Sequence, residues 1–557
     1  MKYISYINAF VAMCLMTIVT GCNENKLDIP QQGVVSEENY YQTDAEAEAA
    51  LANIYAIWRQ AYSGNSGNFG SSDLSCNGFF IKNLMSDEIL QGGGRSDITG
   101  MDELYESVVT PTNEWTDYYY KLLYKAIYAA NMVMERVDET SSTKLRARSE
   151  ARCLRAWCNF ELVTLWGNAP LVNHVLQPAE YQISNSTTAE LWSAIEEDLN
   201  TAISSGMLLS KSGIDDIDTG THFTLEAAET LLGKACLYQQ KYADAYTHLK
   251  KVYDSNLYGL IEDYSQLYHI ASNGCREYVL ENVRHLDYNN LWCQYGWLGM
   301  YGNWGFGTRF QAGPDAISYF DFNSTGGYAY FNPSKKLYDA FVAEEGADGY
   351  RLNNCIKTIE QVFGMNIYAD AASSSFACEG LYRMKWLSCM RDENFSWWYF
   401  GQFANTPVIR YADVLLMLAE AAVNSGQQGM ADQCVNQVRN RAHLTSKSGV
   451  TMTDIKTERL LELCMEGVRF QDLIRWGDAP TELADKGKKL PTFTITPEEG
   501  NDYSTAEGIK SAKYQTTLSY TDNERELAGW TSGRDEYLPF PENEIEVNKN
   551  LKQNPGY

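Results

Sequence analysis

Apolar residues recur at three- and four-residue spacing over much of this chain, which predicts a mainly α-helical protein. The clearest helical segments are residues 44–60, 115–137, 143–166 and 189–203. The third of these runs into Gly167-Asn168-Ala169-Pro170, a sequence that typically stops a helix. The first half of the chain is therefore expected to be a set of packed helices.

Two later segments, 230–252 and 416–438, share one spacing of small and apolar residues, with separations of 3, 9, 4 and 3. A tetratricopeptide-like helical hairpin typically has small residues on its first helix, and these face a ridge of apolar side chains on its second helix. Two such hairpins far apart do not make a continuous solenoid, which needs stacked neighbours. Helices 115–139 and 143–166, and those from 189 and 453, could supply further hairpins. The matching residues are Gly233, Cys236, Ala245, Leu249 and Val252, and Ala419, Ala422, Ala431, Val435 and Val438.

Residues 260–405 and 478–540 show weak helical periodicity and are rich in Gly, Asn, Ser and aromatic residues. We expect loops with a few short strands there, packed on the helices. The predicted fold is mainly α, with tetratricopeptide-like hairpins forming a scaffold for long loops. Residues 41–557 would form a single intertwined unit, with a helical-repeat part up to 259 and a second part from 260 to 557.

The charge and composition narrow the function. The formal net charge is −27, so nucleic acid and anionic lipid headgroups are poor partners. The 13 cysteines form no C-x-x-C pair, and the six histidines form no H-x-x-x-H motif. The sequence therefore indicates no metal site and no cofactor.

The N-terminus has the pattern of an export signal. A basic residue follows Met1, a short apolar run comes next, and small residues precede Cys22. The run is shorter than a bilayer-spanning helix and is interrupted by polar residues. Val19-Thr20-Gly21-Cys22 resembles a bacterial lipobox, which implies that residues 1–21 are removed and that Cys22 carries the lipid. The alternative is an ordinary helix with a buried cysteine.

Five stretches occur together in the order typical of one family: CNENKLDIPQ, EARCLRAWCNFELVTLWGNAPLV, IRYADVLLMLAEA, ERLLELCMEGVRFQDLIRWG and YLPFPENEIEVNKNLKQNPGY. They resemble the SusD/RagB family, lipid-anchored nutrient-binding proteins of the Bacteroidetes outer membrane. The resemblance implies a SusD-like α-α superhelix, with residues 22–40 as a lipid-anchored tether. It also implies a lid on a SusC-like TonB-dependent transporter, facing the cell exterior and delivering oligosaccharide or peptide, with no catalytic residues.

The strongest candidate for a ligand site is the segment 286–310, which alternates aromatic residues with glycines and amides. Aromatic faces stack on the C–H faces of sugar rings, and amides bond hydroxyls without burying a charge. The pattern favours a neutral glycan platform, although a buried aromatic cluster is the competing interpretation. The candidate ligand contacts are Trp292, Tyr295, Trp297, Tyr301 and Trp304. A second cluster, FSWWYFGQF at 395–403, is more typical of core packing.

Three further charged residues have competing interpretations. Asp87 resembles a family position that precedes a ligand-facing loop, so we include it as a candidate ligand contact, although a loop brace or helix cap is favoured. Glu466 and Arg469 are three residues apart, and we expect them to lie on one helix in a structural role.

The leading hypothesis is a glycan-binding surface lipoprotein. A peptide-binding member of the same family, a glycoside hydrolase with paired carboxylates and a scaffold without ligand are the alternatives.

Overall fold

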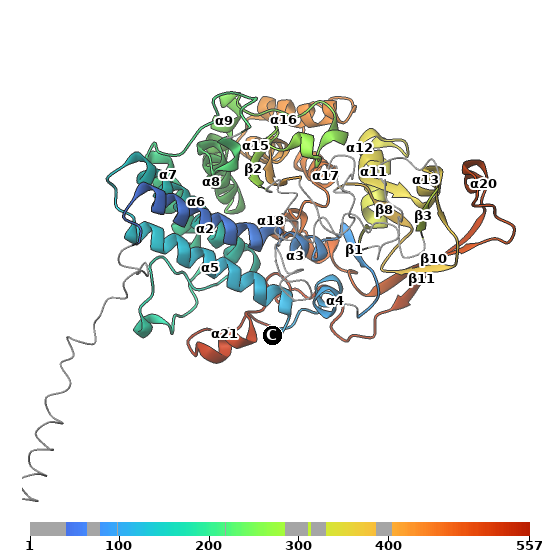
Figure 1. Ribbon diagram of the computed structural model, residues 1–557, viewed down its shortest axis with the longest axis horizontal. Coiled ribbons are helices and arrows are strands. Elements are labelled where there is room, and N and C mark those ends of the chain that lie inside the picture. Colours follow the sequence, from blue (N-terminus) through green and yellow to red (C-terminus); the bar gives the residue numbers. More distant parts are fainter. Residues whose placement is uncertain are drawn as a thin grey trace, which may run out of the picture.

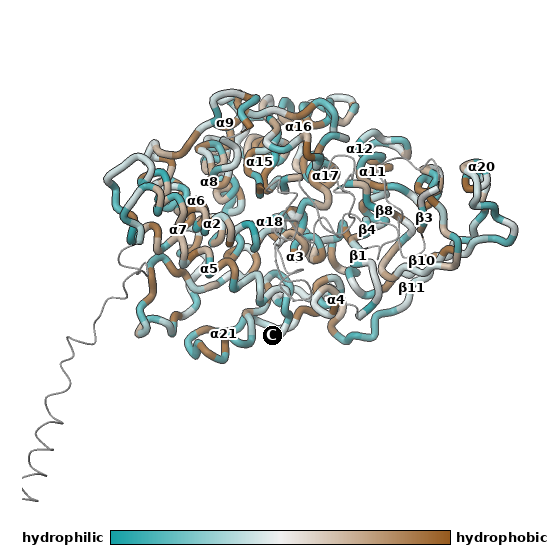
Figure 2. Tube along the Cα trace, viewed as in Figure 1, coloured by the Kyte–Doolittle hydropathy of each residue, from teal (hydrophilic) through white to brown (hydrophobic). Residues whose placement is uncertain are grey.

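The computed structural model describes residues 40–63, 78–96, 98–217, 219–283, 310–313, 330–385 and 404–557. Within these ranges the chain is mainly helical, as predicted. Figure 1 shows long helices gathered on one side of the molecule and strands, with shorter helices, on the other. Hydrophobic and hydrophilic positions alternate along helices such as α5 (Figure 2), as expected where a helix buries one face.

The predicted N-terminal helices all form, and their ends are set by side-chain caps. Asn113 accepts hydrogen bonds from the N–H groups of Trp115 and Thr116, and Ser141 accepts one from Lys144. Gly167, with φ of +69°, follows the end of α6 in a conformation that glycine adopts without strain. These helices are α2 (Asp44–Ser63), α5 (Glu114–Arg136), α6 (Ser142–Leu165) and α7 (Thr188–Ser204).

The two predicted repeats are helical hairpins, α8–α9 and α15–α16. A methyl group at Gly233 would lie 2.7 Å from Cγ of Leu249, so the small residue is what lets α8 and α9 approach closely. Helix α9 also packs against α15, which brings the two hairpins together in space although about 170 residues separate them in sequence. The helices are α8 (Leu225–Tyr238), α9 (Tyr242–Ser255), α15 (Tyr411–Asn424) and α16 (Gln428–Arg441).

The expectation of weak helical structure in 260–405 was wrong for α11 (Lys335–Glu345). Its buried residues are Leu337 and Phe341 only, so the apolar pattern had just two positions. Ser334 caps the helix by accepting from the N–H of Leu337.

Residues 478–540 contain strands, as expected, but two of them are longer than expected. Strands β10 (Lys489–Pro497) and β11 (Tyr514–Asp522) pair over nine residues, and β7 (Ser373–Phe376) joins β10 on its other side. In β11 only Tyr514 is partly buried and the other residues are exposed, so no hydrophobic alternation marks the strand.

The other elements are short and connect these parts. Strand β2 (Tyr278–Asn282) pairs with β9 (Thr406–Arg410), and β1 (Ile89–Gly92) pairs with β4 (Tyr330–Pro333). The remaining elements in the described ranges are α3 (Gly78–Leu84), α4 (Thr99–Glu106), β3 (Phe310–Ala312), α12 (Tyr350–Cys355), β5 (Ile356–Thr358), α13 (Ile359–Gly364), β6 (Ile367–Ala369), β8 (Leu381–Arg383), α17 (Met452–Glu462), α18 (Arg469–Trp476), α19 (Ala479–Glu482), α20 (Ala506–Lys510) and α21 (Glu542–Val547), with 3₁₀ turns η3 (Pro178–Glu180), η4 (Thr219–Thr221), η5 (Tyr264–Gln266) and η6 (Ile270–Ser272).

The C-terminal residues complete the packing at the end of α6. The indole N–H of Trp166 donates to the carbonyl of Pro539, at 3.0 Å. The side-chain amide of Asn554 donates to the carbonyls of Trp166, at 3.0 Å, and Leu538, at 2.7 Å. Buried hydrogen bonds therefore tie the C-terminal segment to the end of α6.

Candidate functional site

Most of the predicted site lies outside the described residues. This holds for Cys22 and for Trp292, Tyr295, Trp297, Tyr301 and Trp304, as well as for the 395–403 cluster. The described residues before segment 284–309 and after segment 386–403 are neighbours, because Asn282 at the end of β2 pairs with Thr406 at the start of β9. The side chain of Asn282 also donates to the carbonyl of Arg59 in α2.

Asp87 is described, and its carboxylate is held by two cations. Arg469 contacts it through two nitrogens, at 2.9 and 3.1 Å, and the ammonium of Lys336 lies 2.7 Å away. Burial raises the pKa of Asp87, but the hydrogen bonds and charges of Arg469 and Lys336 outweigh it and lower the pKa to about 2. Asp87 thus links Arg469 of α18 to Lys336 of α11, which favours a role as a structural brace over direct contact with a ligand.

The adjacent Glu88 faces a different environment. Its side chain is 1% exposed and accepts a hydrogen bond from the N–H of Met465 at 3.0 Å. Burial raises the pKa of Glu88 to about 8, so the two neighbouring carboxyl groups have opposite protonation states at neutral pH. A glycosidase needs both carboxyl groups beside one bond. Asp87 lines the pocket described next, whereas Glu88 is not part of the lining of that pocket, so this pair does not have that arrangement there.

The pocket beside Asp87 has a volume of about 390 Å³, within the range of small-molecule sites. Its aromatic walls are Tyr105 from α4 and Tyr520 from β11, and Tyr520 is 48% exposed. The sequence did not point to either tyrosine, because the residues that meet here come from segments more than 400 positions apart. The pocket also has hydroxyl groups and charges of both signs, from Ser86, Asp87, Ser334, Lys336, Glu379, Thr481, Glu482, Asp485, Lys486 and Lys489.

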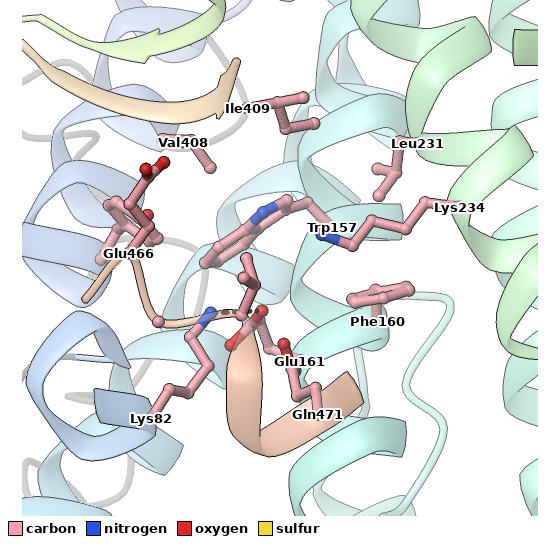
Figure 3. Close-up of a pocket in the computed structure, with 13 residues that line it drawn as sticks. Lys82, Trp157, Phe160, Glu161, Leu231, Lys234, Val408, Ile409, Glu466 and Gln471 are labelled. Carbon is pink, nitrogen blue, oxygen red and sulfur yellow. Dashed lines mark hydrogen bonds and ion pairs between the residues drawn. The ribbon is translucent and has the colours of Figure 1, made fainter. Parts of the chain in front are cut away.

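A second pocket lies between the helical side and β9, and Figure 3 shows its lining. Lys82 and Glu161 point toward each other across it, 3.0 Å apart, and Tyr119 donates to the same carboxylate at 2.7 Å. Its free space is about 20 Å³, enough for one water molecule but not for a sugar ring. We therefore treat it as an interior hydration site and the pocket beside Asp87 as the candidate binding site.

The family-like charged motifs form a buried ion-pair network. Arg410 donates to Glu466 at 2.9 and 2.6 Å, to Glu462 at 3.0 Å and to Glu277. Arg410, Glu277 and Glu462 are each at most 1% exposed. A structural role for these charges, as expected for Glu466, agrees with this geometry.

The placement of Glu466 and Arg469 on one helix was wrong. Helix α17 ends at Glu462 and α18 begins at Arg469, so Glu466 lies in the turn between them. Glu466 faces Arg410 and Lys385, whereas Arg469 faces Asp87. The residues 463–468 break the helix because Met465 and Gly467 both have positive φ angles. Arg152 and Arg155, which are also three residues apart, both lie on α6 and both contact Asp198.

Among the described residues, no three His, Cys, Asp or Glu side chains are grouped as metal ligands would be. In the same part of the chain, no helix is long and apolar enough to cross a bilayer.

Two family models match the chain. One, described as the SusD family, matches residues 360–557, and one described as "Starch-binding associating with outer membrane" matches residues 34–237. The chain belongs to the SusD/RagB family, a family associated with the outer membrane.

Individual relatives match over most of their length. The chain is 24% identical over 497 residues to SusD-like protein P25 of Formosa agariphila, covering 84% of this chain and 90% of that protein. A laminarin-binding SusD-like protein has the same fold, with a TM-score of 0.71 and 25% identity over 93% of this chain and all of the other. Surface glycan-binding protein A from Bacteroides thetaiotaomicron, solved with laminarihexaose, gives a TM-score of 0.68 at 19% identity, covering 92% of this chain and 100% of that chain.

Proposed function

We propose that this protein binds glycans and has no catalytic activity. The observation that carries the proposal is the likeness, over nearly the whole of both chains, to a laminarin-binding SusD-like protein. The proposed ligand contacts are Trp292, Tyr295, Trp297, Tyr301 and Trp304, on the sequence argument that rings and amides suit sugar hydroxyls and C–H faces.

We further propose that Cys22 is lipidated and that the protein faces the cell exterior on a SusC-like TonB-dependent transporter, to which it delivers the glycan. The lipobox-like sequence before Cys22 supports the anchor, and the outer-membrane association of the family supports the location. The family resemblance supports the transporter as partner.

A binding panel tests the ligand proposal. The soluble chain from residue 23 is measured against soluble polysaccharides and oligosaccharides, including laminarihexaose, as wild type and with Trp292→Ala, Trp297→Ala and Trp304→Ala. Loss of one stacked ring should weaken binding by about tenfold, and Trp530→Ala, outside the proposed segment, serves as the matched control. Three variants that all bind like wild type would show that the aromatic segment is not the site. Hydrolysis of any bound glycan by pure protein would instead favour a hydrolase.

A fractionation experiment tests the anchor. Cys22→Ala should leave a folded protein that is lost from the membrane fraction, because one attached lipid no longer holds it there. If the variant stays membrane-bound in cells that lack the transporter, the anchor proposal fails.

A further inference from the structure

One cation in the pocket beside Asp87 contacts an aromatic ring instead of a carboxylate. Lys486 follows α19, and its ammonium lies 4.9 Å from the centre of the Tyr105 ring. Among the residues that the structure describes, this ammonium makes no hydrogen bond and no ion pair. The ring attracts the cation but accepts none of its three N–H bonds, so the half-buried charge is only partly compensated.

The other charges around Lys486 are paired with one another or exposed. Lys336 contacts Asp87 at 2.7 Å and Glu482 at 2.5 Å, Asp485 lies 3.5 Å from Lys488, and Glu379 accepts from the hydroxyl of Tyr520 at 2.8 Å. On α4, Glu106 pairs with Arg95 and Arg525, and Lys489, at the start of β10, is exposed. Among the described residues that line this pocket, Lys486 is therefore the enclosed cation that remains once the carboxylates have been assigned.

Burial lowers the pKa of Lys486 to about 7; the charge of Asp87 opposes this and that of Lys336 adds to it. An anion bound beside this amine would favour its protonated form. The net charge of −27 does not preclude such binding, because charges farther than about 8 Å are largely screened at physiological ionic strength.

We propose that this pocket binds the anionic group of an acidic saccharide, with Lys486 as the cation that contacts it and the exposed Tyr520 ring as the surface beneath the sugar. The anion is a carboxylate or a sulfate ester, which share this chemistry. The inference rests on the proposed glycan binding and deepens it, since it names a charged class of sugar for the pocket beside Asp87. A volume of about 390 Å³ is large enough for a short saccharide.

Calorimetry on the full-length chain in detergent tests the proposal with three probes: trigalacturonate for a carboxylate, a sulfated galactose disaccharide for a sulfate, and neutral laminarihexaose. Wild type should bind at least one acidic probe. Lys486→Met should weaken that binding about tenfold or more, because a charge-assisted hydrogen bond is lost. Lys510→Met, which removes an exposed lysine of α20 that does not line the pocket, should bind like wild type.

The pH dependence separates a direct contact from a structural effect. As pH rises from about 6 to about 9, Lys486 loses its proton, so wild-type affinity for the acidic probe should fall at least tenfold, whereas Lys486→Met should show a flat profile. Tyr520→Ala should weaken binding and keep the wild-type pH dependence. This variant tests the pocket even if Lys486→Met fails to fold.

Two results would overturn the inference: no binding of either acidic probe, or acidic-probe binding that is unchanged in Lys486→Met and independent of pH. If laminarihexaose still binds in that case, the proposed glycan function stands and only the charged subsite is wrong. If neither the probes nor the polysaccharide panel bind wild type, both proposals fail.

Discussion

Replacing Arg410 by methionine removes the central cation of the buried ion-pair network. Arg410 is 1% exposed and contacts Glu277, Glu462 and Glu466. The variant keeps a side chain of similar length, so the main change is the loss of charge and hydrogen bonds. Glu277 and Glu462 retain Arg441, and Glu466 retains Lys385, but the network then holds more negative charge than its remaining cations neutralise.

The magnitude follows from the burial of the network. Removing one partner of a buried ion pair costs about 3–5 kcal/mol. The entropy of unfolding is about 2.1 cal/mol/K per residue, so about 500 residues that unfold together give about 1 kcal/mol/K. Arg410→Met should therefore lower the melting temperature by about 3–5 °C.

The assay is differential scanning calorimetry, with glycan affinity measured below the transition. Lys121→Met is the matched control, because Lys121 pairs with Asp117 at 2.7 Å on an exposed part of α5 and should shift the transition by less than about 0.5 °C. Equal melting temperatures for the two variants would refute a stabilising role for the network. A loss of affinity at unchanged stability would assign Arg410 to ligand binding.

Three further predictions follow from the described contacts. Burial raises the pKa of Glu462, but Arg441, Arg410 and Arg351 outweigh burial and lower this pKa to about 2. The ionised Glu462 therefore stabilises the fold above its unfolded-state pKa of about 4.5, and this stabilisation is lost as the pH falls toward 2. The free energy of unfolding in urea should decline from about pH 5 to pH 3, and the decline should be shallower in Glu462→Gln. Gly233→Ala should destabilise the protein by about 1–3 kcal/mol, because the added methyl group crowds Leu249. Gly429→Ala in α16 should stabilise it by about 0.5–1 kcal/mol, because the added methyl group meets no atom within 4 Å. If thermal unfolding shows stability changes of the same sign for both variants, the packing argument is contradicted. Asp87→Asn should lower the melting temperature and leave laminarihexaose affinity unchanged if Asp87 is a brace, while an affinity loss at constant melting temperature would make it a ligand contact.

The helical scaffold was predictable because its signals are local. Capping residues such as Asn113 and Ser141, and apolar positions three or four apart, lie within the helix they define. The α8–α9 hairpin was predictable for the same reason, through Gly233 and its spacing to Leu249. Strand β11 carries no such signal, since its residues after Tyr514 are exposed.

The candidate pocket could not be predicted, because its parts have no local pattern. Lys486 stands in the run Asp485-Lys486-Gly487-Lys488-Lys489, which by sequence alone is typical of a solvated surface turn. Its environment is set by Tyr105, nearly 400 residues earlier, and by Tyr520 from the opposite strand of the hairpin. Likewise, Asp87 contacts Arg469, which lies 382 positions later in the sequence. No local sequence pattern around Asp87 can therefore reveal the partner that determines the role of Asp87.

The hydrogen bonds between the end of α6 and the C-terminal residues also bear on how the protein is made. Asn554 reaches the carbonyl of Trp166 across 388 positions. At 5–20 residues per second, a ribosome needs about 20–80 s to synthesise that interval. During this time the first helices have no partner for their buried end and cannot complete the native structure. The buried end of α6 therefore stays open until synthesis of the chain is nearly finished.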